Sequence, residues 1–180
     1  MKRKAIGDTV ALADLSNIKG LPVQVPQPGK LVHLQFRRFA GCPICNLHLQ
    51  SFFKNSSTLQ ENGIHEVVVF HASRERMLKD VINVPFDLIA DPSRKLYREF
   101  GVESSWKAIL NFKMMRSALK GVRTFGMKKP ESLEAELGLP ADFLIDESGR
   151  IVALKYGTHA NDQWSLDEVI QHAKGEQVNA

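Results

Sequence analysis

The sequence predicts an α/β fold in which a mixed central sheet carries helices on both of its faces. Through residues 31–100, short apolar runs that are typical of strands alternate with segments of helical periodicity. This alternation favours parallel strands joined by right-handed crossovers. Further along, two apolar runs follow one another across the turn at 146–149, which predicts an antiparallel hairpin.

Length and composition limit the class of protein. A chain of 180 residues favours a single domain over 1–180, with residues 1–30 as an N-terminal lead-in and residues 104–135 as a helical insertion. A net charge of +4 is too modest to indicate nucleic acid. No apolar run approaches the roughly 18 residues of a membrane span, so a membrane is not favoured as a partner. The N-terminus does not read as a secretory signal, which favours a cytoplasmic protein.

The first elements can be assigned in order. Residues 1–30 are rich in proline and glycine and predict a short hairpin or an extended segment. The run Leu-Val-His-Leu-Gln-Phe at 31–36 predicts the first strand. After Pro43 the apolar residues follow a mixed helical spacing, and Asn62-Gly63 is a good stop for this helix.

The next elements repeat the strand–helix order. They are a buried parallel strand at 66–70, a helix at 74–81, a strand at 86–90 and a helix at 93–100. Ser73 can cap the first of these helices, and Gly101 closes the second.

The last third of the chain begins with residues 104–135, which carry an apolar and a basic helical face. Residues 107–129 contain seven Lys or Arg and no acidic residue. They could form a lid that attracts an anionic partner, or a membrane-surface helix, but an insertion helix with a solvated face is the simpler interpretation. The predicted hairpin joins 143–145 to 151–155, and Ser165 caps a final helix that runs through residue 173.

The stretch Cys42-Pro43-Ile44-Cys45 carries the clearest functional signal, and it holds the only cysteines of the chain. It lies between the first predicted strand and the following helix. A helix N-terminus favours negative charge, and the thiolate is the reactive form of cysteine, so the placement indicates redox chemistry. Two alternatives are weaker: a pair of inert buried cysteines, and a metal site that adds His48, for which no second Cys/His pair is present.

Arg37 and Arg38 come just before this pair. A neighbouring guanidinium would lower the pKa of Cys42 and could hold an oxyanion. Because side chains alternate along a strand, only one of the two arginines can point toward the cysteines, and charge proximity favours Arg38.

Three stretches resemble a known group of proteins. The order of elements, with Cys-x-x-Cys at the first strand–helix junction, resembles the thioredoxin fold. Residues 138–146, Gly-Leu-Pro-Ala-Asp-Phe-Leu-Ile-Asp, are similar to its cis-proline segment. The stretch from Asp91 through Tyr97 to Gly101-Val102 is similar to the Asp…Tyr-Gly-Val stretch of peroxiredoxins. Over residues 29–175 the chain therefore resembles the peroxiredoxin-like AhpC/TSA family of the thioredoxin-fold superfamily.

The resemblance implies an antioxidant thiol oxidoreductase. Cys42 would attack a hydroperoxide or a disulfide, and Cys45 would close a Cys42–Cys45 disulfide that an external dithiol of the thioredoxin or glutathione type reduces. Pro140 would be the cis-proline that faces the sulfurs and pairs with the substrate backbone. His159, in the loop after the last strand, could donate or accept a proton. No cofactor and no metal are implied, and a homodimer is a possible assembly.

Several helper groups of the related families are missing. If Cys42 is the peroxidatic cysteine, Phe39 and Gln35 occupy the positions of the family's Thr and Pro. Leu139-Pro140-Ala141 stands where peroxiredoxins place an arginine, and Phe36 stands where thioredoxins keep a buried carboxylate. Arg37 or Arg38 could substitute. Two other functions therefore stay open: a thiol-disulfide reductase without peroxidase activity, and a redox-responsive binding protein that uses residues 104–135.

Overall fold

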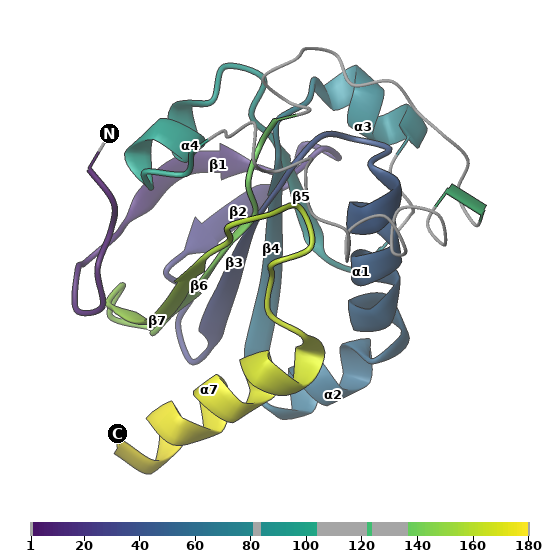
Figure 1. Cartoon of the computed structure of the whole chain (residues 1–180). Helices are drawn as coiled ribbons and strands as arrows, with labels where there is room; N and C mark the ends of the chain where they lie inside the picture. Colours follow the sequence, from purple (N-terminus) through teal and green to yellow (C-terminus); the bar gives the residue numbers. More distant parts are fainter. Residues whose placement is uncertain (1, 81–83, 104–121, 124–136, 180) are drawn as a thin grey trace.

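A five-stranded sheet with the order β5-β4-β3-β6-β7 forms the centre of the computed structural model, which describes residues 2–80, 84–103, 122–123 and 137–179 (Figure 1). Its strands are β3 (Leu31–Arg37), β4 (Ile64–Phe70), β5 (Asp87–Ala90), β6 (Ala141–Ile145) and β7 (Ile151–Tyr156). Strands β3, β4 and β5 are parallel, whereas β6 and β7 are antiparallel to their neighbours. The predicted mixed sheet is confirmed.

The sheet is covered on both faces. The helices are α1 (Pro43–Lys54), α2 (Ser56–Glu61), α3 (Arg74–Asp80), α4 (Lys95–Glu99) and α7 (Leu166–Asn179). One face packs against α4 and against the hairpin of β1 (Leu12–Ser16) and β2 (Pro22–Val25), which is the short hairpin predicted for the lead-in. The other face packs against α1, α3 and α7 (Figure 1).

The alternation of side chains along β3 divides the core. Val32, Leu34 and Phe36 point into the apolar cluster shared with the hairpin and α4. His33, Gln35 and Arg37 alternate with them and are also fully buried, so their side chains face the opposite side, under α1 and α7. A central strand with one polar, buried face is unusual, because buried polar groups must find partners.

Three helices differ in detail from the prediction. The last, α7, continues to Asn179, beyond the predicted end at residue 173. The segment after Pro43 is interrupted at Asn55 and continues as α2, which ends just before Asn62-Gly63 as expected. The helix predicted at 93–100 begins only at Lys95, because Arg94 adopts a left-handed backbone conformation with φ of 58°. Apart from residues 122–123, the predicted helical insertion at 104–135 lies outside the described residues, so it stays a prediction.

None of the helices in the described part of the chain has the length and hydropathy that a membrane span requires.

Candidate active site

Cys42 is the N-cap residue of α1, and Pro43 occupies the first helical turn. The backbone N–H of Cys45 donates a hydrogen bond to the sulfur of Cys42 at 3.4 Å. Proline is well suited to this position because the first amides of a helix have no partner within the helix. Gly41, with φ of +78°, makes the turn that brings the chain from β3 into the helix. The Cys42 sulfur therefore lies where a helix stabilises negative charge.

The two cysteines differ in acidity. Burial raises the pKa of Cys42, but the Cys45 thiol, the charge of Arg38 and the backbone N–H groups of Cys45 and Ile44 outweigh it and lower this pKa to about 7. Burial, together with the neighbouring Cys42 sulfur, raises the pKa of Cys45. Cys42 is therefore the first of the pair to ionise, at a pH close to neutral, and Cys45 is the thiol that donates to it.

The side chains of the adjacent residues Arg37 and Arg38 point to different parts of the protein. Arg38 lies with its guanidinium 5.5 Å from the ring centre of Phe39, at the site, and its charge acts on Cys42. The fully buried Arg37 instead donates to Asp142 at 2.7 Å and to the Phe36 carbonyl at 3.1 Å, under α1. Arg38 is thus the arginine that can act on the cysteines directly.

The sulfurs lie inside an apolar cluster. Cys42 and Cys45 are both free, and each is only 1% exposed. The cluster also contains the side chains of Phe39, Ile44, Leu49, Phe70 and Ala160. A reactant must therefore be small, or the loops around the pair must open before chemistry.

Pro140 and the loop of His159 lie at the sheet end where β3 leads into the cysteine pair. In the register, Ala141 pairs with Phe36 on one side and with Tyr156 on the other. Gly157 donates to the Pro140 carbonyl at 2.9 Å, and a Cβ on Gly157 would lie only 2.7 Å from Pro140 Cγ. Only glycine fits this close approach.

The predicted cis bond at Pro140 is wrong. Among the described residues the cis peptide bond is Val25–Pro26, not Leu139–Pro140. Pro140 directly precedes β6, where a proline needs no N–H for the sheet, so its backbone matches an ordinary strand-initiating proline.

His159 is partly exposed, and its Nδ1 accepts a hydrogen bond from the backbone N–H of Asn161 at 3.2 Å. No described contact joins its ring to Cys42. The next residue, Ala160, is the one that packs into the cysteine cluster. A catalytic role for His159 stays a prediction.

Tyr97, in the stretch from Asp91 to Val102, is a residue of the site that sequence reasoning missed. Its hydroxyl donates to the carbonyls of Arg37 and Val69, the latter at 3.1 Å. It thereby attaches α4 to the end of β3, immediately before the residues that carry the cysteines. Burial raises the pKa of Tyr97 far above its usual value, so the hydroxyl stays protonated and remains a donor.

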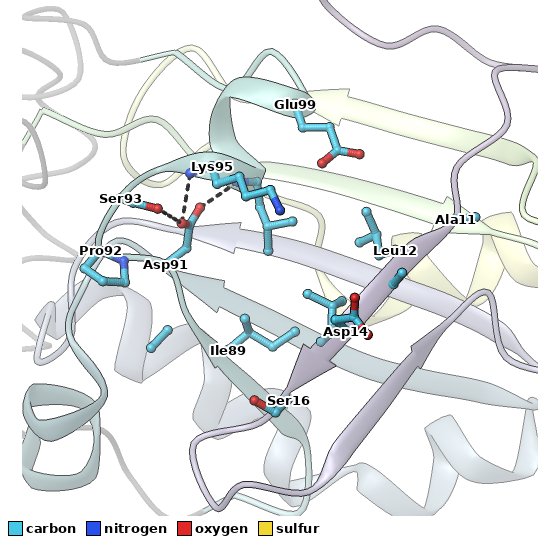
Figure 2. A pocket seen from close by; sticks show the side chains of 14 residues that line it. Ala11, Leu12, Asp14, Ser16, Ile89, Asp91, Pro92, Ser93, Lys95 and Glu99 are labelled. Atoms are coloured by element: carbon cyan, nitrogen blue, oxygen red, sulfur yellow. Dashed lines mark hydrogen bonds between the residues drawn. The ribbon is translucent and has the colours of Figure 1, made fainter.

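The helix that carries Tyr97 is fixed by Asp91. Both carboxylate oxygens of Asp91 are used: Oδ1 accepts from the backbone N–H of Lys95 at 2.9 Å, and Oδ2 from that of Leu96 at 2.8 Å (Figure 2). A cavity of about 480 Å³ lies between β1 and the segment from β5 to α4; Figure 2 shows the side chains that line it. Neither cysteine lines this cavity, so it is distinct from the thiol site.

A cluster of buried polar side chains, which sequence reasoning missed, lies under α1. It consists of the buried side chains of His33, Gln35, Arg37, Glu66 and Asp142. The signal was present in the sequence, since every second residue of 33–37 is polar within a strand that is otherwise apolar. Partners on β4 and β6 could not be assigned before the register was known. Among the described residues, no group of three or more His, Cys, Asp or Glu could hold a metal ion.

Comparisons with known proteins agree with this architecture. The chain matches the family model described as the AhpC/TSA family over residues 6–154. The crystal structure of peroxidoxin BcpB from Mycobacterium tuberculosis is similar with a TM-score of 0.68 and 19% identity, covering 94% of this chain and 96% of that one. A reduced 2-Cys peroxiredoxin from Plasmodium vivax is similar with a TM-score of 0.61 and 15% identity, covering 83% and 67%. At such identities the two structures establish the thioredoxin-like fold. No curated protein sequence matches significantly.

Proposed function

The chain belongs to the AhpC/TSA family, and from this premise we propose that it reduces hydroperoxides with Cys42 as the nucleophile and Cys45 as the resolving thiol. Membership makes the protein an antioxidant thiol oxidoreductase of the peroxiredoxin kind. The assignment of roles within the pair is supported by one observation above all: the Cys42 sulfur caps α1 and has a pKa of about 7, whereas the pKa of Cys45 is raised.

The proposed reaction balances in two steps. The Cys42 thiolate attacks the terminal oxygen of the hydroperoxide, the O–O bond breaks, and the alkoxide leaves as an alcohol after taking up a proton. This gives a sulfenic acid on Cys42. Cys45, one helical turn away, loses its proton and attacks that sulfur, so that the S–S bond forms and water leaves. An external dithiol then reduces the disulfide and restores both thiols.

Burial favours a hydroperoxide over a protein disulfide as the oxidising substrate. With Cys42 only 1% exposed, a small molecule needs a smaller opening than a folded protein does. In the proposal, Arg38 attracts the polar oxygens, and Pro140 and the loop of His159 border the entrance. This chain lacks the threonine and the arginine that the family has at these positions, so Arg38 takes over part of their electrostatic role.

The second candidate is a thiol-disulfide reductase. It is favoured by the Cys-x-x-Cys spacing itself, in which both thiols lie on the first turn of one helix. Stopped-flow measurement of thiolate loss with hydrogen peroxide or an organic hydroperoxide, beside the rate of reduction of a disulfide-bonded protein, separates the two. Fast oxidation by peroxide supports the proposal. Indifference to peroxide with fast disulfide reduction overturns it in favour of the reductase.

Variants of the two cysteines test the roles. Cys45→Ser should retain one turnover with peroxide and accumulate a sulfenic acid on Cys42 that a dimedone probe traps. Cys42→Ser should abolish the reaction. Accumulation of the sulfenic acid on Cys45 instead would reverse the assignment.

Three accompanying proposals concern partners and location. We propose an external dithiol as the reductant, a homodimer as the assembly and the cytoplasm as the compartment. A redox-dependent binding role would use residues 104–135. Partner binding that stays sensitive to oxidation in the Cys42→Ser variant would rule this role out.

A further inference from the structure

Five buried side chains form a closed ring of polar contacts beneath α1. Glu66 contacts His33 Nδ1 at 2.8 Å, and His33 Nε2 lies 3.3 Å from Asp142 Oδ1. Asp142 Oδ1 also accepts from Arg37 at 2.7 Å, Arg37 donates to Gln35, and Gln35 donates back to Glu66. All five are less than 5% exposed. Such a network is rigid when every member has a partner, and costly when one is removed.

The ring is close to electrically neutral. Burial lowers the pKa of His33, but the charges of Glu66 and Asp142 raise it to about 9, so this imidazole is a cation at neutral pH. Arg37 is the second cation, and the carboxylates of Glu66 and Asp142 are two anions. The second Asp142 oxygen accepts from the backbone N–H of Trp164 at 3.2 Å, which leaves both of its oxygens paired.

Arg37 connects this ring to both sides of the thiol site. Its guanidinium lies 3.3 Å from Nε2 of His48, on the helix that Cys42 caps. Burial and the charge of Arg37 lower the pKa of His48, so this ring is neutral and its Nε2 can accept. At the other end of Arg37, the backbone carbonyl accepts from Tyr97. The next residue in the chain is Arg38.

We propose that Asp142 and His48 are positioning residues which, through Arg37, hold Arg38 and the start of α1 in the arrangement that favours the Cys42 thiolate. The catalytic purpose of this arrangement rests on the proposed function. The contacts that make up the arrangement do not depend on it. Arg37 is fixed by its guanidinium and by its carbonyl, so the direction in which Arg38 leaves the strand is fixed as well. His48 ties α1 to the same guanidinium.

The first test is Asp142→Asn, read as the pH midpoint of Cys42 alkylation by iodoacetamide, followed by mass spectrometry. The titratable and charged groups that act on Cys42 in the described structure are Arg38 and Cys45. Removing a negative charge would by itself favour the thiolate and lower the midpoint. Loss of positioning would raise it, by about one pH unit. The two effects have opposite signs, so a rise reports repositioning, and an unchanged or lowered midpoint in a folded variant overturns the proposal.

His48 supplies a second pair of variants that leaves the net charge unchanged. His48→Leu cannot accept from Arg37 and should raise the alkylation midpoint, whereas His48→Gln keeps an acceptor and should restore it. Equal midpoints in both variants would contradict the positioning role. Asp146→Asn, which removes a carboxylate from the β6–β7 turn, is the matched control and should leave the midpoint unchanged.

The outcome separates this inference from the proposed function. If the variants shift the midpoint while the wild-type protein ignores peroxide, the ring positions the thiolate but the peroxidase proposal fails. If peroxide is reduced and the midpoint is insensitive to Asp142 and His48, the peroxidase proposal stands and the positioning role fails.

Discussion

The backbone N–H of Cys45 donates to the sulfur of Cys42 at 3.4 Å, within the first turn of α1. The residue that stabilises the thiolate is therefore also the one placed to close the disulfide. This contact explains why two similar thiols, one helical turn apart, differ. Cys42 ionises and becomes the nucleophile, whereas Cys45 keeps its proton. It also makes the acidity of Cys42 sensitive to the side chain at position 45.

Replacing Cys45 should make Cys42 less acidic. Burial already raises the pKa of Cys42, and the Cys45 thiol is the largest contribution that lowers it. Cys45→Ala removes that donor, so the pH midpoint of Cys42 alkylation should rise from about 7. Cys45→Ser keeps a hydroxyl donor and should raise it less. An alanine variant with the wild-type midpoint would show that the backbone N–H groups suffice.

Removing the charge of Arg38 should slow Cys42 alkylation at neutral pH. Arg38→Met keeps an unbranched apolar side chain against Phe39 but loses the cation that lowers the pKa of Cys42. We expect roughly a two- to fivefold lower rate at pH 7, which corresponds to a rise of about half to one unit in a pKa of about 7. Arg98→Met, on the exposed face of α4, is the control for losing one positive charge. Equal rates in the two variants would rule out a local effect of Arg38.

Tyr97→Phe should destabilise the fold. The variant removes a buried hydroxyl that donates to the carbonyls of Arg37 and Val69. The expected cost is about 1–3 kcal/mol in the free energy of unfolding, measured by urea denaturation. Tyr156→Phe loses hydroxyl contacts at a half-buried position and should cost less, because water can replace them. The opposite order of the two variants would mean that Tyr97 does not fix the end of β3.

His33 should make the protein less stable in alkaline solution. Its folded pKa of about 9 lies above the unfolded value of 6.5, so its contribution is complete below pH 6.5 and is lost as the pH rises through 9. The full loss is about 3 kcal/mol. Cys42 has a lowered folded pKa and contributes with the opposite sign in this range, so the measurement belongs in the Cys42→Ser background.

In that background, the free energy of unfolding should fall between pH 6.5 and pH 9, and adding His33→Gln should flatten the curve. Parallel curves with and without His33 would show that the imidazole is not charged in the folded protein.

Much of the fold could be predicted from local patterns. The strand at 31–36, the helix stop at Asn62-Gly63 and the hairpin around 146–149 each depend on a short stretch whose pattern or turn residues specify one local structure. The start of α4 could not be predicted. The pattern favours a helix from residue 93, whereas the helix begins at Lys95 and Asp91 supplies the acceptors for its first N–H groups. Which residue caps a helix depends on the conformation of the surrounding backbone, and residue propensities carry no information about that conformation.

The sequence by itself determined the element order, the family and the place of the thiol pair at the mouth of a helix, because periodicity, turn residues and the Cys-x-x-Cys spacing are local. Only the tertiary structure decided which arginine serves which site. Arg37 and Arg38 are neighbours in sequence, yet Asp142, more than a hundred residues away, holds the first, and the second remains beside Cys42. The reason is physical: a buried charge takes its position from its partner, and the partner is set by the sheet register.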